Sequence, residues 1–188
     1  MKKQILHIAN IQTGLYAKPE EKGDVVYLQA KHFDKNGELK SALYPDIKSE
    51  MVNVKHILKA GDILFAAKGT KNFAALFEKH NIPAVASTSF FVIRITERNV
   101  LPEYLVWVLN HPNTQIILKD KARGTSIPSI RKADLDEIEF IIPAIEKQRL
   151  IVQLSKLARK ESSISHKIAD LKNQLLEQEL LKELNKII

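Results

Sequence analysis

The sequence contains no cysteine, which excludes disulfide bonds, thiolate catalysis and zinc knuckles. Its six glycines form no dinucleotide-binding fingerprint, and the stretch AAKGTKN has its glycine, lysine and threonine in a different order from a phosphate-binding P-loop. No apolar run approaches the about 20 residues of a membrane-spanning helix. His7 and Asn10 interrupt the first apolar stretch before it reaches the length of a secretory signal. We therefore expect a cytoplasmic protein.

Side chains that often carry catalysis are scattered along the chain. There are six histidines, but no two lie four residues apart and no set of carboxylates adjoins them. Ser87, Thr88 and Ser89 fall on a predicted strand with no neighbouring base. We predict no catalytic residue, no metal site and no cofactor of its own, and we expect that this chain binds while another chain does the chemistry.

What the sequence does have is positive charge. The 188 residues carry a net charge of +7 and give a pI of about 9.5, which favours an anionic partner such as nucleic acid. The excess is spread along the chain and does not form a basic tail. Hydrophobic residues make up 45% and charged residues 27%, as is typical of a globular protein.

Residues 1–143 have the pattern of a mixed α/β (α+β) domain. β-branched and aliphatic residues bounded by turn formers predict strands at 4–8, 24–30, 51–58, 63–67, 83–95 and 137–142. Residues 72–80 fit a strand better than a helical turn, with a hairpin turn at 79–83. A helix begins at Pro102, and His111–Pro112 should kink or divide it. We expect a mixed or antiparallel sheet.

Residues 144–188 form a second domain, in which neither glycine nor proline occurs. A helix over 144–187 would be roughly 65 Å long. Apolar side chains follow the alternating spacing of a coiled coil, interrupted by Glu161, at Leu150, Leu154, Leu157, Ile164, Ile168, Leu171 and Leu175. Beyond Leu175 the stripe shifts to another face of the helix. Because a lone helix has no core, we predict that this seam mediates dimerisation.

Predicted loops of the first domain carry side chains suited to DNA. Basic groups bind phosphates, whereas polar groups read base edges. The candidates are Tyr16, Lys18, Lys31, Lys35, Lys68, Lys71, Asn72, Lys121, Arg123 and Arg131. Asn72 and Arg123 have the amide and guanidinium groups that form paired hydrogen bonds with bases. The alternative for each lysine is a solvated loop tip.

An ordered set of motifs resembles the specificity subunits of type I restriction–modification systems. It consists of Gly-Asp-Ile-Leu at 61–64, Pro-Glu-Tyr-Leu at 102–105, Gly124-Thr125 followed by a strand that ends at Pro143, and Glu146, Gln148 and Ile151 on the next helix. The motifs span almost the whole chain. The pattern differs from the family in two places: the usual Pro-Pro-Leu-x-Glu-Gln is PAIEKQ here, and a tryptophan common near the start is missing.

The resemblance implies a target recognition domain that binds double-stranded DNA, without catalysis. It also implies a methyltransferase subunit that binds S-adenosylmethionine, with a restriction or translocase subunit as a further potential partner. Family chains have two recognition domains and two long helices, whereas this chain has one of each. We therefore expect a half-subunit, which pairs through antiparallel helices into a homodimer and reads a palindromic bipartite site.

Two alternatives stay open. The chain fits the recognition part of another bifunctional restriction–modification enzyme, or a coiled-coil interaction protein that does not read DNA. Residues 124–132 fit a phosphate cradle, a DNA contact or a structural corner. We favour the corner, with a helical turn that has Ser129 as its N-cap and Asp134 and Asp136 outside it. Arg123, Arg131 and Lys132 would then contact the DNA backbone or the methyltransferase.

Overall fold

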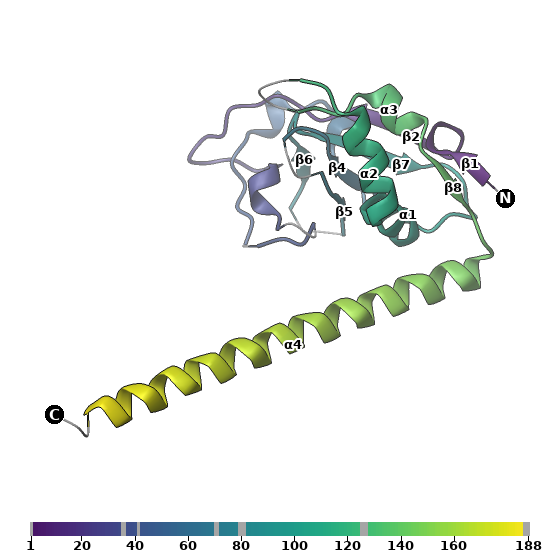
Figure 1. Cartoon of the computed structure of the whole chain (residues 1–188). Coiled ribbons are helices and arrows are strands. Elements are labelled where there is room, and N and C mark those ends of the chain that lie inside the picture. The colour runs from purple at the N-terminus through teal and green to yellow at the C-terminus, as the bar shows by residue number, and fades with distance from the viewer. Residues whose placement is uncertain are drawn as a thin grey trace. The chain divides into compact units, whose positions relative to one another are not determined.

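The computed structural model describes residues 2–34, 37–40, 42–69, 72–78, 82–124 and 128–185. The chain divides into two compact units, Met1–Arg149 and Leu150–Ile188 (Figure 1). The first turn of the long C-terminal helix therefore belongs to the first unit. None of the helices among the described residues combines the length and the apolar character that crossing a bilayer requires.

A four-stranded antiparallel sheet forms the centre of the first unit. Its strands lie in the order β2 (Ala9–Thr13), β7 (Phe90–Ile95), β4 (Ile63–Ala66) and β5 (Ala74–Leu76). All four residues of β4 are buried, which explains why its sequence is continuously apolar and does not alternate. The strands predicted at 63–67 and 72–80 are confirmed.

Two smaller sheets complete the unit. β3 (Val26–Leu28) pairs in parallel with β6 (Ala84–Ala86), and β1 (Lys2–Gln4) pairs antiparallel with β8 (Glu139–Ile141). The hairpin predicted at 79–83 is wrong, because β5 pairs with β4 whereas β6 pairs with β3; residues 79–81 lie outside the described residues. A turn at Ser87–Ser89 splits the apolar run 83–95 between two sheets.

The strands predicted at 4–8 and 51–58 are also wrong. Ile5–His7 forms a 3-10 turn, η1, and residues 49–56 contain two more, η3 (Ser49–Met51) and η4 (Val54–His56). In η4 the side chain of Asn53 accepts a hydrogen bond from the N–H of Lys55 at 3.1 Å, which favours a helical turn over a strand. Val54 is 82% exposed whereas Leu58 is buried, so the alternating apolar residues do not share one buried face.

Two helices follow β7, as the sequence predicts. α1 (Pro102–Asn110) and α2 (Pro112–Lys121) are separated at His111, whose ring caps α2 by accepting from the N–H of Asn113 at 3.3 Å. The side chain of Asn110 donates to the carbonyl of Ala74 and accepts from its N–H, both at 2.8 Å. α1 is thereby fastened to the edge strand β5, beside which it lies (Figure 1).

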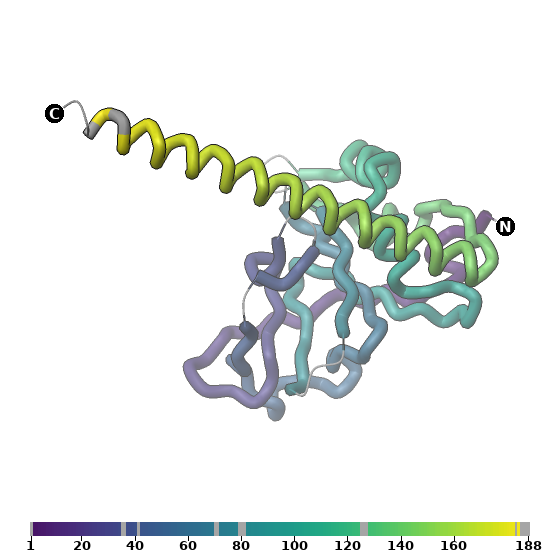
Figure 2. The backbone as a smooth tube through the Cα atoms, turned by 90° about the horizontal axis from the view of Figure 1, so that it is seen from below, coloured from purple at the N-terminus to yellow at the C-terminus, as the bar shows by residue number. Residues whose placement is uncertain are grey.

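The remaining helices are η2 (Ala30–His32), α3 (Lys132–Asp136) and α4 (Ile145–Asn185). The backbone of α4 continues unbroken for 41 residues (Figure 2). The main core of the first unit includes Phe33, Phe73 and Phe90, whose ring centroids lie 5.6 to 6.0 Å apart. These rings hold the segments after η2 and before β5 against the start of β7.

Candidate nucleic-acid interface

Two loops with predicted DNA-binding residues leave the main sheet at the same end. Thr13, the last residue of β2, pairs with Phe91, and Ala66, the last residue of β4, pairs with Phe90. Both strands therefore end at the start of β7. The chain that follows them carries Tyr16, Lys18, Lys68 and Asn72.

A third loop begins at the same end. β3 runs parallel to β6, and the N–H of Ser87, just before β7, donates to the carbonyl of Leu28, the last residue of β3, at 2.8 Å. Lys31 follows on η2 and is exposed. We call this end of the sheets, with Tyr16, Lys18, Lys31, Lys68, Asn72 and Arg123, the loop end. The predicted residues Lys35 and Lys71 lie outside the described residues.

Arg123 joins the loop end through the segment whose role the sequence left open. The backbone of Ser129 forms bridges with both Lys68 and Arg123, and its hydrogen bonds with Arg123 are 2.8 and 3.0 Å long. Gly124 has a φ of +112°, which favours glycine over other residues. The backbone that follows residue 127 returns beside Arg123, and Ser129 lies between Lys68 and Arg123 and pairs with each of them. Residues 125–127 lie outside the described residues.

The helical turn after this segment differs from the prediction. The N-cap of α3 is Arg131 and not Ser129, because the backbone of Ser129 is taken up by the bridges. Asp134 lies inside the helix and is buried, and its carboxylate accepts from the guanidinium of Arg131 at 2.7 and 2.8 Å. These bonds lower the pKa of Asp134 to about 2. Asp136 also lies within α3, where it pairs with Lys132.

Three predicted DNA contacts have partners within the chain. The guanidinium of Arg131 is held by Asp134, and the ammonium of Lys121 pairs with Glu137 at 2.8 Å. The amide of Asn72 donates to the carbonyl of Ala66 at 2.9 Å. These three groups are held by partners within the unit, whereas the side chains of Lys68 and Arg123 are exposed and have no ion pair with a described residue.

Tyr16 is held out into solvent by a residue that sequence reasoning missed. The hydroxyl of Tyr27, on β3, donates to the carbonyl of Leu15 at 2.9 Å and accepts from the N–H of Ala17 at 3.3 Å. Both neighbours of Tyr16 are thus fixed, while Tyr16 itself is 72% exposed. The only sequence signal is that a tyrosine on a buried strand needs a hydrogen-bond partner for its hydroxyl.

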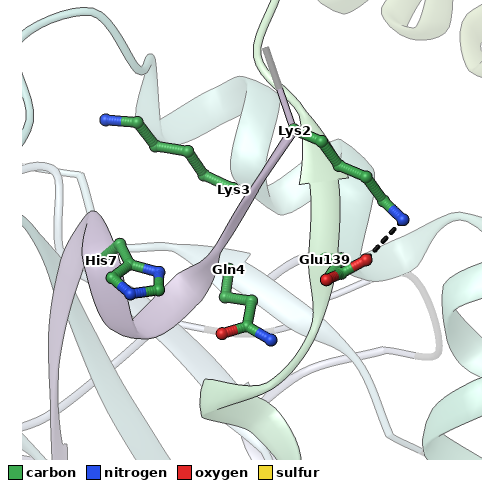
Figure 3. A pocket seen from close by; sticks show the side chains of 5 residues that line it. All are labelled: Lys2, Lys3, Gln4, His7 and Glu139. Carbon is green, nitrogen blue, oxygen red and sulfur yellow. Dashed lines mark ion pairs between the residues drawn. The ribbon is translucent and has the colours of Figure 1, made fainter.

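A cavity of about 540 Å³ lies away from the loop end, beside β1, η1 and β8. Its lining includes Lys2, Lys3, Gln4, His7 and Glu139 (Figure 3). The ammonium of Lys2 forms an ion pair with Glu139, and that of Lys3 lies 3.5 Å from Glu97, so carboxylates neutralise both cations. The described residues contain no cluster of three or more side chains suited to hold a metal ion.

The predicted dimerisation seam forms a second exposed surface, on α4. Its side chains lie on one helix, and each is between 48% and 63% exposed: Leu150, Leu154, Leu157, Ile164, Ile168, Leu171 and Leu175. Isolated exposed leucines are common, but an apolar stripe of this length, with Glu161 as its one polar position, is typical of a surface that another chain covers.

Comparison with known proteins identifies the family. Residues 2–173 match the model of the type I restriction modification DNA specificity domain. The chain belongs to this family. The search of curated proteins gave no match for this specificity domain.

Solved structures share the fold of this specificity domain, with its mixed sheets and long C-terminal helix. The HsdS subunit from Thermoanaerobacter tengcongensis is 20% identical, with a TM-score of 0.66 over 89% of this chain and 44% of that chain. The S subunit of a type I system from M. genitalium is 17% identical, with a TM-score of 0.56 over 85% and 39%.

A third similar structure comes from work on complex assembly and conformational transition of the type I R-M system. It is 14% identical to the specificity domain, with a TM-score of 0.67 over 93% of this chain and 42% of that chain. The specificity domain thus spans less than half the length of each of these three relatives.

Proposed function

We propose that this chain is a sequence-specific DNA-recognition subunit of a type I restriction–modification system, without catalysis of its own. The loop end carries the proposal: in a chain of the specificity-domain family, it gathers exposed cations and an exposed aromatic ring on loops fixed by a rigid sheet. Recognition loops on a rigid scaffold are the usual arrangement for specific binding.

The side chains of the loop end fit different parts of DNA. Lys18, Lys31 and Lys68 suit phosphates, because a lysine ammonium is a point charge without fixed geometry. Arg123 suits a guanine edge, which accepts two parallel hydrogen bonds from a guanidinium. The ring of Tyr16 offers a flat apolar surface beside them. Phosphate contacts supply affinity, and Arg123 supplies sequence preference.

The recognition units act in pairs, which α4 joins. The seam on α4 is symmetric about residues 162–163, so two copies of the helix match best when they run antiparallel. Leu150 then meets Leu175, Leu154 meets Leu171, Leu157 meets Ile168, and Glu161 meets Ile164 of the other copy. In a parallel pair Glu161 would face its own copy, and two carboxylates would be buried against each other.

The charges along α4 also favour the antiparallel pair. From residue 145 to 167 basic residues outnumber acidic ones, whereas from 168 to 185 acidic residues outnumber basic ones. Antiparallel pairing brings the basic half of each helix to the acidic half of the other, and parallel pairing brings like halves together. A symmetric pair of recognition units then reads a palindromic site with two half-sites.

A methyltransferase subunit completes the proposed assembly. It binds S-adenosylmethionine and transfers the methyl group, while the present chain selects the DNA site. A restriction or translocase subunit would join the same complex. The solved relatives support this proposal, since two are S subunits and the third comes from work on assembly of the type I R-M system.

A DNA selection tests the proposal. The full chain, alone and with the methyltransferase subunit of its own system, is incubated with a random double-stranded DNA library, and we expect a bipartite palindromic motif. Recovery of no motif in either case would refute the recognition role. A motif that appears only with a fused nuclease–methyltransferase would point to another kind of restriction–modification enzyme.

The salt dependence of affinity tests the loop end itself. Replacing Lys68 by alanine removes a cation that neutralises a phosphate, so the slope of log K against log salt should become shallower by about 1, whereas Arg123→Ala should relax the base preference at one position. The matched control is Lys2→Ala, an exposed lysine on β1 that pairs with Glu139. If the control changes the slope as much as Lys68→Ala, the DNA does not contact the loop end.

A further inference from the structure

Gln148 is fully buried, with 0% of its surface exposed, in the first turn of α4. Its neighbours Lys147 and Arg149 are exposed. A polar side chain is expensive to bury unless its hydrogen-bonding groups are satisfied, and an apolar residue would fill the same space at lower cost. The presence of an amide here therefore calls for an explanation beyond packing.

The amide of Gln148 ties three chain segments together. Its Oε1 accepts from the N–H of Leu101 at 2.9 Å, and its Nε2 donates to the carbonyls of Asn99 and Pro143, both at 2.8 Å. Leu101 is the N-cap of α1, and Pro143 follows β8. One side chain thus fastens the first turn of α4 to the start of α1 and to the end of the last strand.

Hydrogen bonds are directional, whereas apolar contacts allow sliding and rotation. Three bonds from one planar amide fix both the position and the rotation of the first turn. Because α4 continues from Ile145 to Asn185 without a break, a rotation of that turn is passed along the helix. The seam centre at residues 162–163 is roughly 22 Å along the helix from Gln148.

Over this length of helix, a small change in the direction of the first turn is large enough to alter the distance between two DNA half-sites. If the helix axis tilts by about 10° at the first turn, a point 22 Å along the helix moves by about 4 Å, which is close to the 3.4 Å rise of one base pair. One base pair also turns the duplex by about 35°. A paired protein with rigid junctions would therefore accept one distance between half-sites, and one with loose junctions would accept several.

We propose that Gln148 is a positioning residue that sets the spacing between the two DNA half-sites. It does not touch DNA and does not alter which bases each recognition unit reads. The proposal rests on the proposed function, because it requires two paired recognition units. The spacing between half-sites would then depend on how the first turn of α4 is held, and not on the loop end or the seam alone.

The test uses DNA duplexes that carry the selected half-sites with the best spacer, and with spacers one and two base pairs shorter or longer. The full chain is compared with Gln148→Met, which keeps the volume of the side chain and removes the amide. We expect the ratio of Kd between the neighbouring and the best spacers to fall about tenfold in the variant, with the preferred half-site unchanged. Gln153→Met, at an exposed glutamine of the same helix, should keep the original profile.

A second measurement applies if Gln148→Met does not fold. In the unmodified chain the N–H of Leu101 should exchange slowly with solvent, because it is bound to Gln148. Exchange as fast as that of an exposed loop would overturn the proposal, as would an unchanged spacer profile in Gln148→Met. If the unmodified chain shows no bipartite site, the proposed function fails and this inference with it. A sharp spacer preference that the variant retains refutes this inference alone.

Discussion

Replacing Leu157 and Ile164 together by lysine should separate the paired chains. Both side chains lie on the seam of α4, two layers that flank Glu161, and in the single chain they are 63% and 50% exposed. Pairing would bury this remaining surface against the other helix. Lysine keeps the helix propensity but cannot bury its ammonium there.

The size of the effect follows from these exposures. Burying a leucine or isoleucine completely contributes about 1.5–3 kcal/mol, so the exposed half to two-thirds contributes about 1–2 kcal/mol for each side chain. Two positions on two helices make four side chains, or about 4–8 kcal/mol for the dimer. At about 1.4 kcal/mol per factor of ten, the dissociation constant should rise roughly a thousandfold or more.

Light scattering and sedimentation over the micromolar range measure this change. The unmodified chain should be a dimer and the seam variant a monomer with the same helix content by circular dichroism. The matched control, Ser163→Lys with Asn173→Lys, adds the same charge on the outer face of the helix and should remain a dimer. An unmodified chain that is monomeric at tens of micromolar, or a control that dissociates equally, would contradict the reasoning.

Three further changes have defined outcomes. Asp134→Asn should lower the free energy of unfolding in urea at pH 7. Because the pKa of Asp134 is lowered from 3.8 to about 2, the difference in unfolding free energy between the variant and the unmodified chain should narrow as the pH falls from 4 to 2. Asn110→Ala leaves the N–H and carbonyl of Ala74 unpaired, so urea denaturation should show a loss of about 1–3 kcal/mol. Glu161→Leu removes the polar layer of the seam, so sedimentation should show a dimer at least about tenfold tighter.

The sequence predicted the elements whose signals are local. The structure confirms three of these local signals: the proline at the start of α1, the break at His111–Pro112 and the turn before β4. Pairing between distant strands was not predictable in the same way. The apolar run 83–95 indicated burial, but burial is equally compatible with a hairpin to β5 and with the observed split between β3 and the main sheet.

The two mistaken strands show a related limit. In 51–58 the alternation of apolar and polar residues suggested a half-buried strand, yet Met51 and Val54 are exposed. A short alternation of this kind occurs by chance in turns that start with a residue such as Asn53, whose side chain bonds to its own backbone. The seam of α4 repeats over a much longer stretch, and there the helix was predicted correctly.

Residue type alone did not separate the side chains that face a partner from those that hold the fold. The sequence predicts that Asn72 reads a base, because an amide in a basic loop can do so, but the structure shows its amide donating to the carbonyl of Ala66. In the sequence, Gln148 is only one position of a family motif, whereas in the structure its buried amide links three segments. Both amides have the same chemistry, and only their burial and partners distinguish them. For Lys68 and Arg123 the decisive fact is equally non-local, since the backbone of Ser129 brings together two cations that the sequence holds far apart.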